Sequence, residues 1–444
     1  MKKVLSLILL VALVLSVTAC ASTATTTAAT TAAAGETTAA ATEATTASTE
    51  PVTIIVTNGK GEIAAQFTQA AKDFQVVNPN ITVDAQSVTV GDTVGIYDKL
   101  TAAGKKVVMP MVEPYSVNDK YKDIVASMDG AKWIADTDSA FKNAAGNIVG
   151  FPFVIEGFGI VYNKTVVEKA VGGTFDPYSI KTRDQFIALL DKVVASGIKL
   201  PIAYQTEFWS VSNHYSSQFI NQATDKLAFV ADMKAGKVDF INNAVWNGYY
   251  DTMDVLASKK YNVYGERPLG KYYDEAHVKV GSGAAAFLFN GNWAFDSLKA
   301  VAGNEFGFIG VPFTNDEKDP NAGKITAGPT QVMIIDKSAT PAEQAAAEKF
   351  LEWMVYDTKG QDFVVNQSQC ISAFKNNPNK VTNPLGAALA DAIGKGMTLD
   401  FSTNYVSAGD YGDILAPDVQ KYIDGKETRA DLAKAFTAYY TSLG

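Results

Sequence analysis

The sequence predicts an α/β protein with two lobes, and three observations support this prediction. Short runs of β-branched and aromatic residues alternate with stretches of helical periodicity from residue 52 onwards. The first runs follow one another in the order of a strand–helix–strand unit. The part of the chain that carries these patterns, residues 51–444, is longer than a single sheet usually organises, which indicates a second lobe.

The first strand–helix–strand unit is expected at residues 52–83. Residues 52–57 are all Val, Ile or Thr, which is typical of a strand. Asn78-Pro79-Asn80 ends the helix that follows, and Ile81 starts a second strand. Because a helix joins the two strands, we expect a right-handed parallel crossover. Apolar residues at spacings of four and three predict the buried face of this helix, at Ile63, Phe67, Ala70, Phe74 and Val77.

Three later helices are predicted from the residues at their first turns. Thr182 with Gln185 has the spacing of a capping box, Thr340 precedes a proline, and Thr428 opens the last helix. These helices alternate with short strands, so we expect the whole body to be α/β. The strand-like runs lie at residues 148–154, 285–289, 306–311 and 331–335.

The N-terminus has the pattern of an export signal. Two lysines follow Met1, and the apolar run at residues 4–17 is too short to span a bilayer comfortably. Val-Thr-Ala-Cys at residues 17–20 resembles the lipobox of bacterial lipoproteins, in which the cysteine is lipidated. We therefore expect a signal peptide at residues 1–19 and lipidation of Cys20, the alternative being an ordinary cleavage site with a chance cysteine.

Residues 20–50 are predicted to form a solvated tether. Residues 21–50 contain twelve Ala, twelve Thr, two Ser, one Gly and three Glu, so nothing in them can form a core. Two acyl chains suffice for stable membrane anchoring. We expect the protein on the extracellular face of the cell membrane. The long tether and the lack of a disulfide framework indicate a Gram-positive cell surface.

Charge and cysteine content exclude several classes of function. Lys and Arg total 38 against 47 Asp and Glu, and the net charge of −9 argues against a nucleic-acid partner. Two cysteines and two histidines leave little for a metal cluster, so we expect no metal and no cofactor. Cys370 is expected to be a buried, unpaired thiol. His214 is expected to be a hydrogen-bonded structural histidine.

Residues 150–164 carry a resemblance to a known family. They read Gly-Phe-Pro-Phe-Val-Ile-Glu-Gly-Phe-Gly-Ile-Val-Tyr-Asn-Lys. This segment resembles the carbohydrate-binding solute-binding proteins of ABC importers, the family that includes maltose-binding protein. There, a Gly-aromatic-Pro segment crosses between lobes, an acidic residue follows, and Tyr-Asn-Lys ends the next strand. Further elements follow in the family's order at residues 182–197, 206–209, 283–293 and 418–444.

The resemblance implies a two-lobed periplasmic-binding-protein-like fold of type II with a hinge. One stretch, residues 104–113, departs from the family because it lacks the usual Pro-Asp-Val. Glu113 is expected to take the acidic role one strand-length later. We expect the N-terminal lobe to comprise residues 51–152 and 313–365. We expect the C-terminal lobe to comprise residues 153–312 and 366–444.

The same resemblance implies a sugar site of carboxylates, amides and aromatic rings. A sugar has hydroxyls on its rim and C–H patches on its faces, which suit two-pronged polar groups and flat aromatic walls. Each candidate also has a structural alternative, such as a core position for Trp293 or a hinge role for Glu156. We expect the ligand-binding residues to be Asn58, Glu113, Glu156, Glu207, Trp209, Asn292, Trp293 and Tyr405.

The function implied is that of a lipid-anchored protein that captures a mono- or oligosaccharide between its lobes. It would deliver the sugar to the permease of an ABC importer, as a monomer and without catalysis. A protein of the same fold that binds a polyamine or ferric iron is one alternative, since acidic residues with tryptophans also bind cations. A carbohydrate-active enzyme is another, because carboxylates can form a glycosidase pair.

Overall fold

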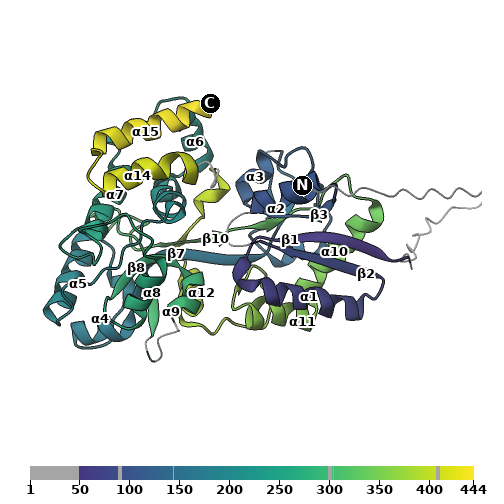
Figure 1. Ribbon diagram of the computed structural model, residues 1–444, viewed down its shortest axis with the longest axis horizontal. Coiled ribbons are helices and arrows are strands. Elements are labelled where there is room, and N and C mark those ends of the chain that lie inside the picture. Colours follow the sequence, from purple (N-terminus) through teal and green to yellow (C-terminus); the bar gives the residue numbers. More distant parts are fainter. Residues whose placement is uncertain (1–49, 89–92, 144, 299–302, 304, 407–410) are drawn as a thin grey trace, which may run out of the picture. The chain divides into compact units, whose positions relative to one another are not determined.

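Strands and helices alternate along the chain, as the sequence predicts (Figure 1). The computed structural model describes residues 50–88, 93–143, 145–298, 303, 305–406 and 411–444. Residues 48–444 form one compact unit. The predicted signal peptide, Cys20 and nearly all of the predicted tether lie outside the described residues.

The described strands pair into three sheets. The first sheet contains β2 (Ile81–Ser87), β1 (Val52–Asn58) and β3 (Val107–Met109). The second contains β4 (Met111–Val112), β11 (Val332–Met333), β6 (Ile148–Pro152) and β5 (Phe141–Lys142). The third contains β7 (Val154–Asn163) with β8 (Phe287–Gly291), β9 (Phe306–Ile309), β10 (Ile325–Pro329), β12 (Ile371–Ser372) and β13 (Thr398–Leu399).

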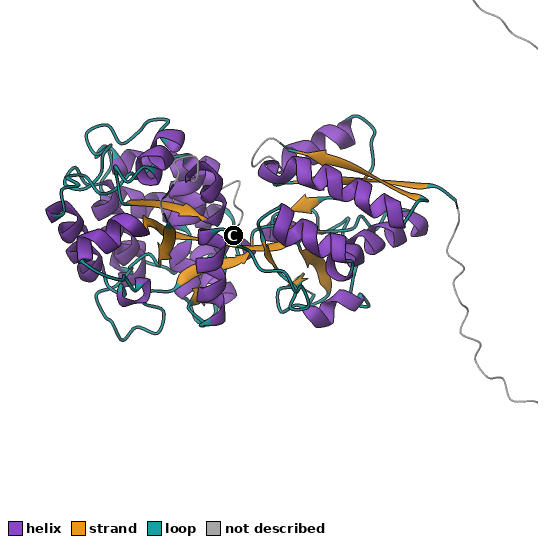
Figure 2. Ribbon diagram, turned by 90° about the horizontal axis from the view of Figure 1, so that it is seen from below, coloured by secondary structure: helices purple, strands orange, loops and turns teal. Residues whose placement is uncertain are grey.

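Helices flank these strands (Figure 2). In the first part of the chain they are α1 (Ala64–Val77), α2 (Thr93–Ala102), α3 (Pro114–Asn118), α4 (Lys164–Val171) and α5 (Arg183–Ala195). The middle part contains α6 (Lys226–Lys234), α7 (Ala244–Ala257), α8 (Tyr273–Gly281) and α9 (Phe295–Leu298). The last part contains α10 (Pro341–Tyr356), α11 (Thr358–Asp362), α12 (Pro384–Gly394), α14 (Ala416–Ile423) and α15 (Arg429–Ser442).

The opening unit has the predicted topology. β1 and β2 are parallel, with Val52 opposite Ile81, and α1 connects them. Phe67 and Phe74 of α1 are fully buried, so the predicted apolar face is confirmed there. Val77 is wrong as a core residue, because it ends the helix and is 55% exposed.

The three predicted helix starts are confirmed, and each is a capping box. The side chains of Thr182, Thr340 and Thr428 accept hydrogen bonds from the backbone N–H three residues later. The side chain at that later position accepts in turn from the backbone N–H of the threonine. Two N–H groups that a helix start leaves unpaired are satisfied this way in α5, α10 and α15.

The two lobes have separate hydrophobic cores. In the N-terminal lobe, Phe67 and Phe74 of α1 pack edge-to-face against Phe350 of α10. In the C-terminal lobe, Phe158 and Tyr215 pack edge-to-face against Phe289 of β8. These separate cores are what the α/β two-lobed prediction requires.

β7 runs from one core to the other, and all ten of its residues are buried. Val154 and Ile155 belong to the core of the N-terminal lobe, whereas Phe158 and Ile160 belong to that of the C-terminal lobe. β10 lies antiparallel to β7 along this passage, with Gly328 opposite Glu156 (Figure 1). The residues around Glu156 therefore stand where the chain passes between lobes.

After β7 the chain passes between the lobes again, and strand pairing indicates positions for these passages other than the expected boundaries at residues 313 and 366. β10 pairs with β7 and β13, whereas β11 pairs with β4 and β6, so the chain changes sheets at Thr330. Val381 still belongs to the N-terminal core, and Leu385 packs with β8 and β9 residues. We therefore propose crossings near residues 330 and 382.

Candidate functional site

A buried ion pair joins the turn that follows β1 to strand β7. The Nζ of Lys60 lies 2.6 Å from Oε1 of Glu156, and each side chain is only 6% exposed. Oε2 of Glu156 accepts a hydrogen bond of 2.5 Å from the hydroxyl of Thr330. Lys60 also contacts the half-exposed Glu62 at 2.6 Å. Glu156 thus has a partner on each oxygen, one from the turn after β1 and one from the β10–β11 crossing.

Lys60 remains charged despite its burial. Desolvation by itself lowers the pKa of Lys60, but the carboxylates of Glu156 and Glu62 more than offset this and raise its pKa well above the ordinary value. Asn58 holds the turn that places Lys60. Its Nδ2 donates to the Lys60 carbonyl at 2.9 Å and to Ser87 at 3.1 Å, and its Oδ1 accepts from the Lys60 N–H at 3.0 Å. Both amide protons of Asn58 are therefore occupied.

Asn292 and Trp293 are held beside β7 by the end of β8. Oδ1 of Asn292 accepts from the backbone N–H of Gly157 at 3.0 Å. The ring of Trp293 lies over Gly291, where a Cβ would come within 2.2 Å of ring carbons. Gly291 has an extended backbone, so the missing side chain, and not an unusual conformation, is what makes room for the ring.

Trp293 belongs to an aromatic cluster built around His214, which we define as Phe158, Trp209, His214, Trp293 and Phe401. The His214 ring stacks on Phe158 with centroids 4.8 Å apart. Trp209 and Trp293 lie 5.2 and 5.1 Å from the His214 ring, and Phe401 lies at 6.0 Å. The two tryptophans expected in the sugar site are therefore brought together through one imidazole.

The hydrogen bond expected of His214 does not involve its Nδ1, which has no partner among the described residues. The ring packs against Phe158 by stacking. Burial lowers the pKa of His214 to about 3, so the ring is neutral at physiological pH. A neutral, flat imidazole suits a wholly aromatic neighbourhood, because a charged one would be stranded in it.

Tyr273 connects the aromatic cluster to a second histidine. The Tyr273 ring lies 6.0 Å from Trp209 and 4.3 Å from His277. Nδ1 of His277 lies 2.6 Å from the Tyr273 carbonyl and Nε2 lies 3.0 Å from Nδ2 of Asn290. These partners fit a neutral imidazole that donates from Nδ1 and accepts at Nε2. Burial also lowers the pKa of His277, which agrees with the neutral form.

Glu207 begins the helical turn that carries Trp209, and its carbonyl accepts from the N–H groups of Ser210 and Val211. Burial raises the pKa of the Glu207 carboxyl, and the charge of Asp274 adds to this. The backbone N–H groups of Glu207 and Tyr273 act in the opposite direction. Neither carboxylate oxygen has a hydrogen-bond partner of sound geometry within the described chain, although both oxygens are buried.

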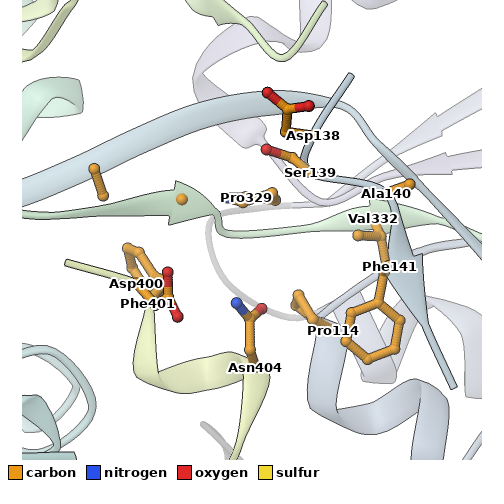
Figure 3. A pocket seen from close by; sticks show the side chains of 12 residues that line it. Pro114, Asp138, Ser139, Ala140, Phe141, Pro329, Val332, Asp400, Phe401 and Asn404 are labelled. Atoms are coloured by element: carbon orange, nitrogen blue, oxygen red, sulfur yellow. The ribbon is translucent and has the colours of Figure 1, made fainter. Parts of the chain in front are cut away.

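A pocket of about 230 Å³ lies beside the β10–β11 crossing. Figure 3 shows Asp138 and Ser139 on one side of Pro329, and Asp400 and Asn404 on the other. Its lining comes from both lobes, because Asp138 precedes β5 and Asn404 follows β13. Gly328 lets Phe401 approach β10 closely, since a Cβ there would lie 3.2 Å from the Phe401 Cβ. Phe401 thus belongs to both the pocket and the aromatic cluster.

The structure brings five of the predicted site residues into one contiguous set. Contacts run from Glu156 along β7 to Asn292, then through Trp293, His214 and Trp209 to the turn of Glu207. Asn58 joins this set through Lys60. The contiguous residues are Glu156, Glu207, Trp209, Asn292 and Trp293.

Glu113 and Tyr405 come from other segments than this set. Glu113 is half-buried at the start of α3, and Tyr405 donates to Asp400 at 3.0 Å with Lys226 5.9 Å from its ring. Their chain neighbours Pro114 and Asn404 line the pocket, but neither residue does so itself.

Several residues of the site were not predicted from the sequence. Tyr273 and His277 lie in α8, where their neighbours form an ordinary helical pattern, and no local signal marks them. The position of Lys60 after a strand end, where open α/β sheets place ligands, marks it as a candidate in the sequence, but its pairing with Glu156 depends on tertiary contacts.

The described residues contain no group of three or more His, Cys, Asp or Glu side chains placed to hold a metal ion. None of the helices in the described part of the chain is long and apolar enough to cross a membrane.

Comparison with known proteins assigns the family. A family model described as bacterial extracellular solute-binding protein matches residues 22–358, most of the chain. The chain belongs to this family. A search of curated protein sequences finds no significant match for this solute-binding protein.

Solved structures show the same fold. A family 1 extracellular solute-binding protein from Bifidobacterium longum subsp. infantis is 21% identical with a TM-score of 0.65, over 88% of this chain and 100% of that one. Apo RafE from Streptococcus pneumoniae is 16% identical with a TM-score of 0.69, over 89% and 98% of the two chains. Maltose-bound MalE3 from T. maritima is 16% identical with a TM-score of 0.64, over 88% and 100%.

Proposed function

We propose that this solute-binding protein captures a mono- or oligosaccharide between its lobes and delivers it to the permease of an ABC importer. The observation that carries the proposal is the contiguous set of Glu156, Asn292, Trp293, Trp209 and Glu207. In this proposal the protein acts as a monomer, needs no cofactor and is not an enzyme.

The chemistry of this set suits a sugar. Trp209 and Trp293 offer flat walls for the C–H faces of a ring, and carboxylates and amides offer paired acceptors and donors for its hydroxyls. Neither oxygen of Glu207 has a hydrogen-bond partner of sound geometry among the described residues, so the carboxylate can accept from donors of a ligand. A polar site of this kind rejects analogues that leave its groups unpaired.

Related proteins of the same fold support a carbohydrate cargo. Structures similar to this one include RafE in complex with raffinose, maltose-bound MalE3 and a protein described as binding chitin oligosaccharides.

An anionic cargo is disfavoured because Arg183 and Arg429 already form ion pairs with carboxylates elsewhere in the protein. Arg183 pairs with Asp251, and Arg429 pairs with Asp251 and Asp254. These pairs join α5 and α15 to α7, away from the contiguous set. Anion recognition needs free guanidinium forks.

The two lobes provide a hinge in this proposal. β7, the β10–β11 crossing and the segment before α12 each pass between the cores, and the Lys60–Glu156–Thr330 contacts lie on two of these passages. A sugar that touches both lobes would favour the closed arrangement only by its differential affinity for it. The permease would then recognise the closed form.

A thermal-shift screen of the protein tests the cargo. A ligand at a hundred times its dissociation constant stabilises a protein by about 2.7 kcal/mol, which gives a measurable rise in melting temperature. The panel contains neutral mono- and oligosaccharides, amino sugars, spermidine and ferric iron. A sugar that raises the melting temperature supports the proposal, whereas a response to spermidine or iron alone contradicts it.

We further propose that Cys20 is lipidated and that residues 20–50 tether the protein to the outer face of a Gram-positive membrane. Membrane fractionation of producing cells tests this. The wild type is expected in the membrane fraction, and Cys20→Ser in the soluble or secreted fraction. Equal distribution of the two proteins would contradict the lipid anchor.

A further inference from the structure

We propose that the saccharide carries a protonated amine, which the carboxylate of Glu207 binds beside Trp209 and Tyr273. This inference rests on the proposed function and narrows its substrate class to amino sugars. It draws on the unpaired state of Glu207, on the charges around it and on the rings next to it.

The carboxylate of Glu207 lacks the partners that a buried carboxylate normally has. Both oxygens are buried, and neither has a hydrogen-bond partner of sound geometry among the described residues, although the backbone N–H groups of Glu207 and Tyr273 lie close enough to favour the charged form. In the same part of the chain that the structure describes, no Lys, Arg or His forms an ion pair with it. A buried carboxylate left in this state is costly. A ligand that brings a positive donor would remove that cost, and a neutral donor would remove only part of it.

The charges near Glu207 are negative and not offset. Asp274 and Glu207 influence each other, and Glu62 and Glu207 both act on the Tyr273 hydroxyl. Lys60, the lysine that pairs with Glu156, already contacts both Glu62 and Glu156. The local charge therefore attracts a cation.

The two histidines of the chain do not supply the missing positive charge. In the described chain the His214 ring packs against four aromatic rings, and burial keeps it neutral. His277 has both ring nitrogens engaged by neutral groups, the Tyr273 carbonyl and the Asn290 amide. Both imidazoles are neutral partners in the site.

The aromatic rings beside Glu207 suit an ammonium group. Trp209 and Tyr273 lie 6.0 Å apart and nearly edge to face, at 63°. Aromatic faces attract a cation, and the attraction is larger where water is excluded. An ammonium bound near the turn of Glu207 would be attracted by the carboxylate and by these rings, and the same rings accept the C–H face of the sugar that carries it.

Matched pairs of amino sugars test the inference by titration calorimetry with the whole protein. Glucosamine, galactosamine, mannosamine and their linear oligomers are each compared with the N-acetylated form of the same sugar. Charge-assisted hydrogen bonds are about twice as strong as neutral ones, so we expect at least one amine form to bind on the order of tenfold more tightly than its N-acetylated partner.

Two variants test whether Glu207 causes the preference for the amine form over the N-acetylated form. Glu207→Gln keeps the size of the side chain and removes its charge, so it is expected to bring the two forms within about twofold of each other. Glu305→Gln removes the same charge from an exposed surface pair with Lys164, and the preference is expected to remain.

The outcomes distinguish failure of the amino-sugar inference from failure of the proposed sugar-binding function. If neutral or N-acetylated sugars bind as tightly as the amine forms, or if no amine form binds, the inference is overturned while sugar binding in the thermal-shift screen still supports the proposed function. If no saccharide of any kind binds, both fail. A preference that survives in Glu207→Gln would also overturn the role of Glu207.

Discussion

Nζ of Lys60 and Oε1 of Glu156 are 2.6 Å apart, and this contact joins the turn after β1 to the strand that passes between the lobes. The two residues are 96 positions apart in the sequence. Each is nearly inaccessible to solvent, so the pair combines a high desolvation cost with a strong mutual attraction.

Removing one partner of this pair is expected to destabilise the protein strongly. Lys60→Met leaves Glu156 buried without its counter-charge, and we expect the free energy of unfolding to fall by about 3–5 kcal/mol. Lys60→Met combined with Glu156→Gln is expected to lose less than Lys60→Met alone. Urea unfolding monitored by circular dichroism measures both.

The control for this pair is Lys164→Met, which removes a lysine from an exposed ion pair with Glu305. Its cost is expected to stay below about 1 kcal/mol. Equal losses for Lys60→Met and Lys164→Met would show that the buried pair does not stabilise the fold.

The low pKa of His214 predicts a specific loss of stability in acid. The folded-state pKa of about 3 lies below the ordinary value of 6.5, so the unfolded state binds one more proton between these limits. The stability that the neutral ring provides is therefore complete above pH 6.5 and is lost as the pH falls towards 3. The slope from this residue is at most about 1.4 kcal/mol per pH unit.

His214→Phe keeps a flat ring in the stack and removes the titration. We expect its unfolding free energy to fall less between pH 7 and pH 4.5 than that of the wild type, by about 2–3 kcal/mol. Chemical denaturation at a series of pH values measures the difference. Parallel pH profiles of the two proteins would show that His214 is not the group responsible.

The position of Trp293 is expected to depend on Gly291. In Gly291→Ala the new methyl group would overlap the Trp293 ring, so the ring must move away from its place beside β7. Because the backbone of Gly291 is extended, alanine causes no backbone strain. We expect sugar affinity to fall at least about tenfold with little loss of stability. Gly130→Ala, at an exposed glycine with open space around its Cβ position, serves as the control and should bind as the wild type does.

Cys370 is expected to be unreactive in the folded protein. The thiol is buried, as the sequence predicts, and it is the free cysteine of the described chain. Burial raises the pKa of Cys370 to about 12, although Lys60 opposes this shift, so almost no thiolate exists at neutral pH. In a Cys20→Ser protein, a thiol reagent should label Cys370 only after denaturant is added. Rapid labelling without denaturant would show that the site is open to solvent.

Local structure was predictable from the sequence because its causes are local. Capping boxes at Thr182, Thr340 and Thr428 and the apolar face of α1 depend on residues within two turns of one another. The crossing that we propose near Thr330 is not predictable from the sequence in this way, because it depends on which strands β10 and β11 pair with. β10 is short and has no alternating pattern that would reveal its partner.

In the candidate site, too, some residues were predictable from the sequence and others depend on tertiary contacts. Glu156, Asn292 and Trp293 lie in or next to motifs that resemble the family, and the structure places them side by side. The packing of His214 against Phe158, Trp293 and Phe401, which come from distant segments, was not predicted. The pairing of Tyr273 with the turn of Glu207 depends on tertiary contacts across 66 positions of sequence, which periodicity does not report.

The most direct test of the account is titration calorimetry with the sugar that gives the largest thermal shift. The wild type is compared with Trp293→Ala and with Tyr178→Ala, which removes an aromatic side chain bound to Asp391 outside the site. We expect Trp293→Ala to weaken binding at least about tenfold and Tyr178→Ala to bind normally. Unchanged affinity in Trp293→Ala would contradict the proposed site.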